Sequence, residues 1–221
     1  MEKMMKEKKN AELIAQGVII IDSSRTEIRG SLICGSDVEI DVGCIFEGNV
    51  KLGNNVKVGA YTHIKQSTIL DDTTIKPYSH IDTSEVGQKN NIGPYARLRP
   101  GAKTKNNVNI GNFVEIKNSE IGSGTKINHL SYVGDSEVGE NVNIGAGCIT
   151  CNYDGLNKHK TIIEDDVFIG SNSQLVAPLT IGAGSTIGAG STITKDTPAN
   201  QLTLSRPKQT NIPNWERPKK K

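Results

Sequence analysis

The chain has few of the residues that fill an ordinary globular core. Only 35% of its 221 residues are hydrophobic and 4% are aromatic, with one Trp and three Phe. Its apolar runs are much shorter than the roughly 20 residues that a membrane-spanning helix needs, and its first residues do not resemble a signal peptide. The sequence therefore predicts no membrane insertion, and we expect a cytoplasmic protein.

Charge and cysteine also exclude several classes of function. The net charge is only +2, so the body of the chain does not predict binding to nucleic acid. The four Cys are expected to be free thiols. Cys148 and Cys151 have the spacing of half a zinc site, but Cys34 and Cys44 do not supply a second pair with that spacing. No metal is expected.

What the chain does have is a six-residue period. From Ile40 to Ile193 an aliphatic residue recurs at every sixth position, often followed by one of the 23 Gly. This period is typical of a parallel β-helix, in which three hexads make one coil and each coil stacks only on its neighbours. The sequence predicts an all-β, single-stranded parallel β-helix of about eight coils, with functional sites on its outer faces or between prisms.

The segments at either end do not follow the period. Residues 1–17 are charged and helix-prone, residues 18–197 carry the coils, and residues 198–221 form a tail that contains Trp215. We expect the tail to pack on the last coil or on a neighbouring chain. Its basic end, residues 217–221, is either a solvated terminus or a ligand contact.

One interruption lies inside the repeat. The hexads that begin at 144 and 163 are too far apart, so residues 150–162 are predicted to form a loop that projects outward. Long loops in compact repeats are more often functional than idle, although a neutral insertion is the alternative.

The register of the hexads places one histidine on a row of small side chains. The third residue of each hexad points outward, and on one face these residues are Asn112, His129, Ala146, Ser171 and Ala189. Such a row predicts a shallow groove for an extended ligand. An imidazole titrates near pH 6.5, which suits a general base. The alternative is an inert surface histidine. His63 and His80 are predicted to lie about 14 Å or more from His129, and His159 lies in the loop, so they do not form a convergent metal site with it.

A second cluster is predicted on the adjoining face. Tyr132 should lie one coil from Glu115, and Arg99 and Lys117 occupy equivalent positions 18 residues apart. Two cations about 4.8 Å apart repel one another unless an anion lies between them, and a phosphate would suit both. The alternative is two solvated cations that pair with nearby acids.

Several segments together resemble a known family. They are residues 93–101 (GPYARLRPG), 111–117 (GNFVEIK), 129–135 (HLSYVGD), 143–158 (NIGAGCITCNYDGLNK), 175–178 (LVAP) and 215–221 (WERPKKK). From about residue 11 onward the chain is similar to the C-terminal acetyltransferase domain of the bifunctional bacterial N-acetylglucosamine-1-phosphate uridyltransferase / glucosamine-1-phosphate N-acetyltransferase.

This resemblance implies a left-handed β-helix and a homotrimer with sites between subunits. The implied reaction transfers acetyl from acetyl-CoA to the amine of glucosamine 1-phosphate, for UDP-N-acetylglucosamine, peptidoglycan and lipopolysaccharide synthesis and hence for cell shape. The family's nucleotidyltransferase domain has no counterpart here, so residues 1–17 resemble the end of the connecting helix and uridyl transfer is not expected.

The resemblance also assigns roles to residues. His129 matches the general base; Arg99 and Lys117 match the binders of the sugar phosphate; Tyr132 and Asn143 match sugar contacts. Asn152 and Tyr153 match loop residues near the reacting centre, and the Asn152 amide is expected to stabilise the oxyanion. Lys158 matches a loop lysine that supports a neighbouring site. The acetyl-CoA groove is matched by Ala146, Ser171 and Ala189, and Arg206 matches a contact to a coenzyme phosphate. Glu115 is expected to orient His129.

Two other functions remain open at this point. The first is a hexapeptide acyltransferase with a different acceptor, which competition between acceptors would reveal. The second is a non-catalytic trimeric scaffold, which would bind ligand without releasing a free thiol from acetyl-CoA.

Overall fold

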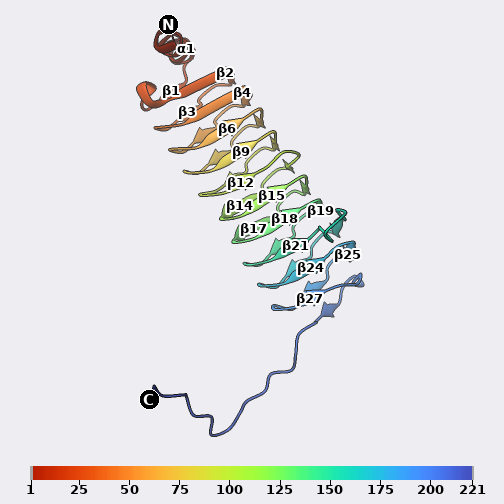
Figure 1. Ribbon diagram of the computed structural model, residues 1–221. Coiled ribbons are helices and arrows are strands. Elements are labelled where there is room, and N and C mark those ends of the chain that lie inside the picture. The colour runs from red at the N-terminus through yellow and green to blue at the C-terminus, as the bar shows by residue number, and fades with distance from the viewer. Residues whose placement is uncertain (1, 221) are drawn as a thin grey trace.

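The protein is a stack of parallel coils with a helix at one end and an extended tail at the other (Figure 1). The structure, a computed structural model, describes residues 2–220. Each strand pairs in parallel with the strand one coil away, usually 17 or 18 positions along the chain, as His80 pairs with Arg97 and Arg97 with Glu115. The expected fold class, an all-β parallel β-helix of hexapeptide repeats with one short helix, is confirmed.

The strands form three faces of a prism, named here in the order of the chain within one coil. In the coil that contains His129, face 3 ends at this residue, face 1 follows it, and face 2 completes the coil. Face 3 contains β1 (Ile19–Ile20), β3 (Glu39–Ile40), β5 (Lys57–Val58), β8 (Thr74–Ile75), β11 (Asn91–Ile92), β14 (Asn109–Asn112), β17 (Lys126–His129), β20 (Asn143–Ile144), β23 (Phe168–Ile169), β26 (Thr186–Ile187) and β28 (Leu202–Thr203).

Faces 1 and 2 are joined by two long strands, β2 (Glu27–Cys34) and β4 (Ile45–Leu52), which run across both of them. Face 1 continues with β6 (His63–Lys65), β9 (His80–Asp82), β12 (Arg97–Leu98), β15 (Glu115–Lys117), β18 (Tyr132–Gly134), β21 (Ile149–Cys151), β24 (Gln174–Val176) and β27 (Thr192–Ile193). Face 2 continues with β7 (Thr68–Ile69), β10 (Glu85–Val86), β13 (Lys103–Thr104), β16 (Glu120–Ile121), β19 (Ser136–Val138), β22 (Thr161–Ile163) and β25 (Leu179–Ile181).

The hexad explains why these strands are short. One aliphatic residue per hexad points inward and is almost completely buried, as Ile75, Ile92 and Ile110 are. The chain then turns a corner, often through a residue in the left-handed region, such as Asn107 at φ 58°. Asn tolerates that region better than most residues. Successive inward side chains stack along the prism axis, so the core is a column that each coil extends.

The two ends differ from the body. Helix α1 (Glu2–Ala15) lies at the end of the prism formed by the first coils, and its residues Asn10 and Leu13 are buried there. A short 3-10 helix, η1 (Ser23–Arg25), precedes β2. At the other end β28 pairs with β26, after which the chain leaves the prism and remains exposed (Figure 1). The expected packing of the tail on the last coil therefore holds for its first residues only.

The prism is longer than the predicted eight coils. Face 3 has eleven strands, because β1 precedes the first clear hexad and β28 lies beyond the last. The period is less clear before residue 40, where the sequence lacks the repeated Gly, so the number of coils was underestimated although residues 18–197 were assigned to the β-helix. No helix within residues 2–220 is long and apolar enough to cross a membrane.

Candidate active site

The interruption of the repeat is a loop that leaves the prism at the corner between faces 1 and 2. The paired residues Asn143 and Phe168 are 25 positions apart, against 17 or 18 in regular coils. The loop folds on itself: Tyr153 and Lys158 form an antiparallel bridge, and Asp154 accepts hydrogen bonds from the amides of Leu156 and Asn157. His159 Nε2 lies 2.7 Å from Asp154 Oδ2, and these contacts hold the pKa of Asp154 well below its usual range. Hydrogen bonds among its own residues therefore hold the loop in this conformation.

His129 lies at the end of face 3, on the row of side chains that the register predicted. Asn112 pairs with His129 across one coil, and the pairing of Ile127 with Ile144 places Ala146 next in the row. The amide of Asn172 donates to Ala146 O at 2.7 Å and that of Gly190 to Ser171 O at 2.9 Å, so the row continues through Ser171 towards Ala189. Arg206 Nη1 donates to Ala189 O at 2.7 Å, which brings the start of the tail to the end of this row.

The partner of His129 differs from the expected one. His129 Nδ1 lies 2.8 Å from Asn112 Oδ1, an exposed hydrogen bond in which the amide oxygen can only accept. Nδ1 is therefore the protonated nitrogen in this arrangement, and Nε2 is left to accept a proton. Glu115, expected to orient His129, binds Arg99 instead, with 2.7 Å between its Oε1 and Arg99 Nη1. The physical reason is register: Glu115 lies directly beside Arg97 on face 1, whereas His129 lies beyond the corner.

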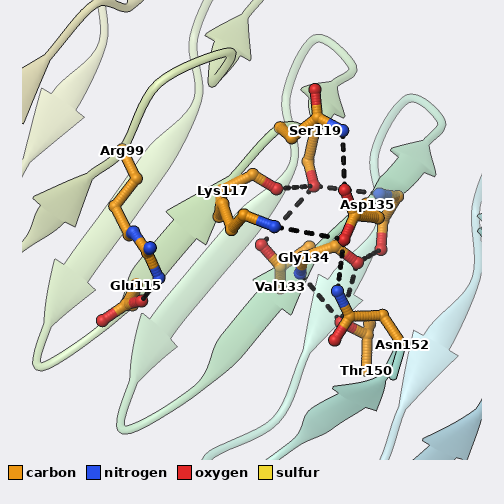
Figure 2. A network of polar contacts seen from close by, with 11 residues as sticks. Arg99, Glu115, Lys117, Ser119, Val133, Gly134, Asp135, Thr150 and Asn152 are labelled. Atoms are coloured by element: carbon orange, nitrogen blue, oxygen red, sulfur yellow. Dashed lines mark hydrogen bonds and ion pairs between the residues drawn. The ribbon is translucent and has the colours of Figure 1, made fainter. Parts of the chain in front are cut away.

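The predicted cation pair is present on face 1, and each cation is paired with an acid (Figure 2). Leu98 pairs with Ile116, which puts Arg99 beside Lys117. Lys117 Nζ lies 3.4 Å from Asp135 Oδ2, and Arg97 Nη1 lies 3.6 Å from the second oxygen of Glu115. The pairing expected by the alternative interpretation of these cations is therefore observed.

A further cation joins this cluster from the loop. Lys158 comes close enough to Lys117 that the hydrogen bond and charge of Lys117 lower the pKa of Lys158, and Arg99 lowers it further. Lys117 keeps its proton, since the hydrogen bond to Lys158 and the charge of Asp135 raise its pKa. Four cations (Arg97, Arg99, Lys117, Lys158) thus converge on two carboxylates (Glu115, Asp135). This excess of positive charge would attract a phosphate.

The remaining predicted residues lie around this cluster. Tyr132 pairs with Glu115 across one coil, as the register predicted. Its ring lies over Gly134, where a Cβ would come within 2.8 Å of the ring atom Cε1, so glycine is needed to make room for the tyrosine. Asn143 begins β20 on face 3, one coil beyond Lys126. Tyr153 is 61% exposed, and its hydroxyl donates to Gly155 O at 2.5 Å.

Asn152 is the most buried residue of the loop's first turn, and its side chain points inward. Its side-chain Nδ2 donates to Asp135 Oδ2 (Figure 2), and its backbone carbonyl oxygen accepts from the backbone amide of His159 at 2.8 Å. The Asn152 amide therefore has one N–H occupied within the chain. Sequence reasoning assigned no role in the site to Asp135 or to Asn112. Asn112 was visible one coil before His129 in the same row, and Asp135 directly follows the site segment of β18.

Two thiols, those of Cys148 and Cys151, lie close in sequence to the site residue Asn152. Burial raises the pKa of Cys148, and the Cys148 thiol donates to the Gly170 carbonyl oxygen. Burial also raises the pKa of Cys151. Neither thiol is poised as a nucleophile. Among residues 2–220, no three His, Cys, Asp or Glu side chains gather into a group that could hold a metal ion.

Comparison with known proteins gives the class. A family model described as the GMPPB C-terminal domain matches residues 28–104, and a model of the bacterial transferase hexapeptide (six repeats) matches residues 160–195. The solved structure of the Francisella novicida UDP-N-acetylglucosamine acyltransferase has a TM-score of 0.61 at 18% identity, over 85% of this chain and 67% of that one. This likeness shows a shared fold. The chain is a hexapeptide-repeat β-helix protein.

Much closer relatives narrow the class. The bifunctional protein GlmU of Nitrosospira multiformis is 56% identical over 210 residues, which are 95% of this chain and 46% of that protein. GlmU of Nitrosomonas europaea is 59% identical over 208 residues, 94% of this chain and 45% of that protein. The chain thus spans about half the length of these relatives and belongs to the same family as their C-terminal part, as the motifs predicted.

Proposed function

We propose that this chain is an acetyl-CoA-dependent N-acetyltransferase that converts glucosamine 1-phosphate to N-acetylglucosamine 1-phosphate. The proposal rests on which residues lie on the two sides of the corner at Leu130. On one side of it His129 is held by Asn112, and on the other side Tyr132 begins the face that carries Arg99 and Lys117. A base and an anion site on the two sides of one corner suit an acceptor with an amine and a phosphate.

The cation cluster would bind the sugar phosphate. Arg99 offers a planar fork and Lys117 a point charge, and phosphate binding would compete with Glu115 and Asp135 for them. Lys158 would add a further positive charge to this phosphate site from the loop. An incoming phosphate would also raise the pKa of Lys158, because an anion between two ammonium groups offsets the repulsion that lowers it. Tyr132 and Asn143 are assigned to the sugar.

His129 would act as the general base. With Nδ1–H directed at Asn112, Nε2 takes a proton from the amine as its nitrogen attacks the thioester carbonyl carbon. The tetrahedral intermediate then collapses and the carbon–sulfur bond breaks. The sulfur leaves as the free thiol with the proton that His129 Nε2 took from the amine. The N–H of Asn152 that Asp135 does not use is the donor assigned to the oxyanion. Tyr153 stands beside it on the loop.

The row from Ala146 through Ser171 to Ala189 would accommodate acetyl-CoA, since small side chains leave room for an extended chain. Arg206, anchored at Ala189, would contact a coenzyme phosphate. We propose a homotrimer as well, because a row on an exposed corner becomes a groove only when another prism lies beside it. The product would serve UDP-N-acetylglucosamine synthesis in the cytoplasm, and through it peptidoglycan, lipopolysaccharide and cell shape.

The test is release of free thiol from acetyl-CoA, with glucosamine 1-phosphate and then glucosamine as acceptor, in the wild type and in His129→Ala. Release that requires both the phosphate and His129 is expected. Equal rates with both acceptors would favour an acyltransferase with another acceptor. Ligand binding without thiol release would refute the proposal in favour of a scaffold.

A further inference from the structure

Asp135 is the point at which the loop is joined to the body of the prism. Its Oδ1 accepts from Asn118 Nδ2 at 2.6 Å, and its Oδ2 accepts from Asn152 Nδ2 and lies 3.4 Å from Lys117 Nζ (Figure 2). The backbone of Asp135 adds two more contacts, since its amide donates to Lys117 O and its carbonyl accepts from the Thr161 amide. One residue thus contacts the preceding coil and both ends of the loop.

The position of Asp135 is unusual for a charge. It lies at the corner between faces 1 and 2, in a row whose backbones are hydrogen-bonded from coil to coil. The four members of the row that precede Asp135 are neutral (Gln66, Thr83, Gly101 and Asn118), and Lys160 follows it in the next coil. Its side chain is only 12% exposed. A carboxylate in such a place costs free energy unless it is fully paired, so its three partners are needed to keep it there.

The surroundings favour the charged form of this carboxyl. Partial burial raises the pKa of Asp135, but the hydrogen bonds from Asn118 and Asn152 and the charge of Lys117 outweigh burial and leave the pKa below its usual value. The carboxylate is therefore present at neutral pH, with each oxygen committed to an amide. The geometry fixes which end of the Asn152 amide faces inward, because a carboxylate can only accept.

We infer that Asp135 is a positioning residue: it fixes the Asn152 amide and hence the loop against the coil that carries Lys117, without contacting substrate itself. Its effect on catalysis rests on the proposed function, whereas its link to the loop does not. A chain without this link would keep its coils, because the corner backbone is held by its own hydrogen bonds. It would lose the fixed orientation of the loop amide.

The informative substitution is Asp135→Asn. Asn adopts the left-handed conformation that residue 135 requires, at φ 49°, so the corner is preserved. It offers one oxygen instead of two, however, and its amino group then faces the amino group of Asn118 or Asn152. The double variant Asp135→Asn with Asn152→Asp reverses the donor and acceptor of the same contact and restores it. Glu120→Gln is the matched control, since it removes an exposed charge that contacts neither the loop amide nor Lys117.

Two readouts separate positioning from damage to the fold. The first is hydrogen exchange of residues 152–160 relative to the coils, in the full chain and without substrate. In Asp135→Asn we expect exchange in the loop to become about 10-fold faster while the coils stay unchanged, and in the double variant we expect it to return to within about threefold of wild type. The second is thiol release, in which kcat should fall about 10-fold in Asp135→Asn.

In the double variant the KM for glucosamine 1-phosphate should match the wild-type value while kcat stays low, because the Asn152 amide is gone. Unchanged loop exchange in Asp135→Asn would overturn the inference, and so would a double variant that fails to restore it. Loss of coil protection in Asp135→Asn would likewise overturn it, since the effect would then be structural. If the wild type releases no thiol, the proposed function fails, and the exchange data still decide the role of Asp135.

Discussion

Removal of the Asn112 side chain tests how His129 is held. In Asn112→Ala the 2.8 Å contact to His129 Nδ1 is lost and the imidazole can adopt either tautomer. A hydrogen bond between neutral groups contributes about 0.5–1.5 kcal/mol, and one to a charged group about 1.5–3 kcal/mol. As the imidazolium forms in the transition state, this contact would strengthen by the difference, about 1 kcal/mol.

This difference predicts the size of the kinetic effect. Because the hydrogen bond is exposed, the lower part of the range applies, and kcat should fall about fivefold, at about 1.36 kcal/mol per tenfold change. The KM for glucosamine 1-phosphate should change little, since the corner at Phe113 separates Asn112 from Lys117 and Arg99 lies one coil further away. The assay is thiol release from acetyl-CoA at saturating substrate.

The variant Asn112→Asp tests in which direction a negative charge beside His129 shifts the pH dependence of the rate. A carboxylate beside the ring stabilises the imidazolium, so the acidic limb of the rate profile should move to higher pH and less base should be available at neutral pH. Asn109→Ala on the same strand is the matched control, because its neighbour across the coil is Lys126 rather than His129. A kcat within twofold of wild type in Asn112→Ala would refute the orienting role.

The remaining predictions concern the base, the anion site and the core. His129→Ala should lower kcat on the order of 10²- to 10⁴-fold with little change in KM, and near-normal turnover would remove it from the role of base. Arg99→Ala should raise the KM for glucosamine 1-phosphate far more than that for glucosamine; an equal loss with both acceptors would contradict a phosphate contact. The pKa of Lys158 is lowered, so Lys158 should lose its charge at a lower pH than an ordinary lysine does. As pH rises, kcat/KM should therefore begin to fall at that lower pH. This alkaline decrease should disappear in Lys158→Met. Ile116→Ala, at a fully buried position, should lower the free energy of unfolding by about 2–5 kcal/mol in urea titrations.

Much of the site followed from the period of the sequence. Each inward aliphatic residue must be buried, so the register of every coil is fixed to the residue, and a slip by one position would expose the core. For this reason the contacts of Arg99 with Lys117, of Tyr132 with Glu115, and of His129 with its row could be stated before the structure was known.

Other parts of the site could not be read from the period. The register places Glu115 on face 1, but its choice of Arg99 over His129 depends on which side of a corner each side chain points. Asn152 and Lys158 lie in the loop, which has no repeat to fix their positions. Their contacts with Asp135 and Lys117 come from a chain segment that folds back across the neighbouring coil.

The sequence by itself determined the β-helix, the register and the row of residues that each face presents, because burial of one aliphatic side chain per hexad leaves a single alignment of the coils. Only the tertiary structure decided which acid meets which cation, which nitrogen of His129 is free, and where the loop is anchored. These depend on side-chain rotation at the corners and on contacts between residues about one coil apart, where several partners of similar energy lie within reach.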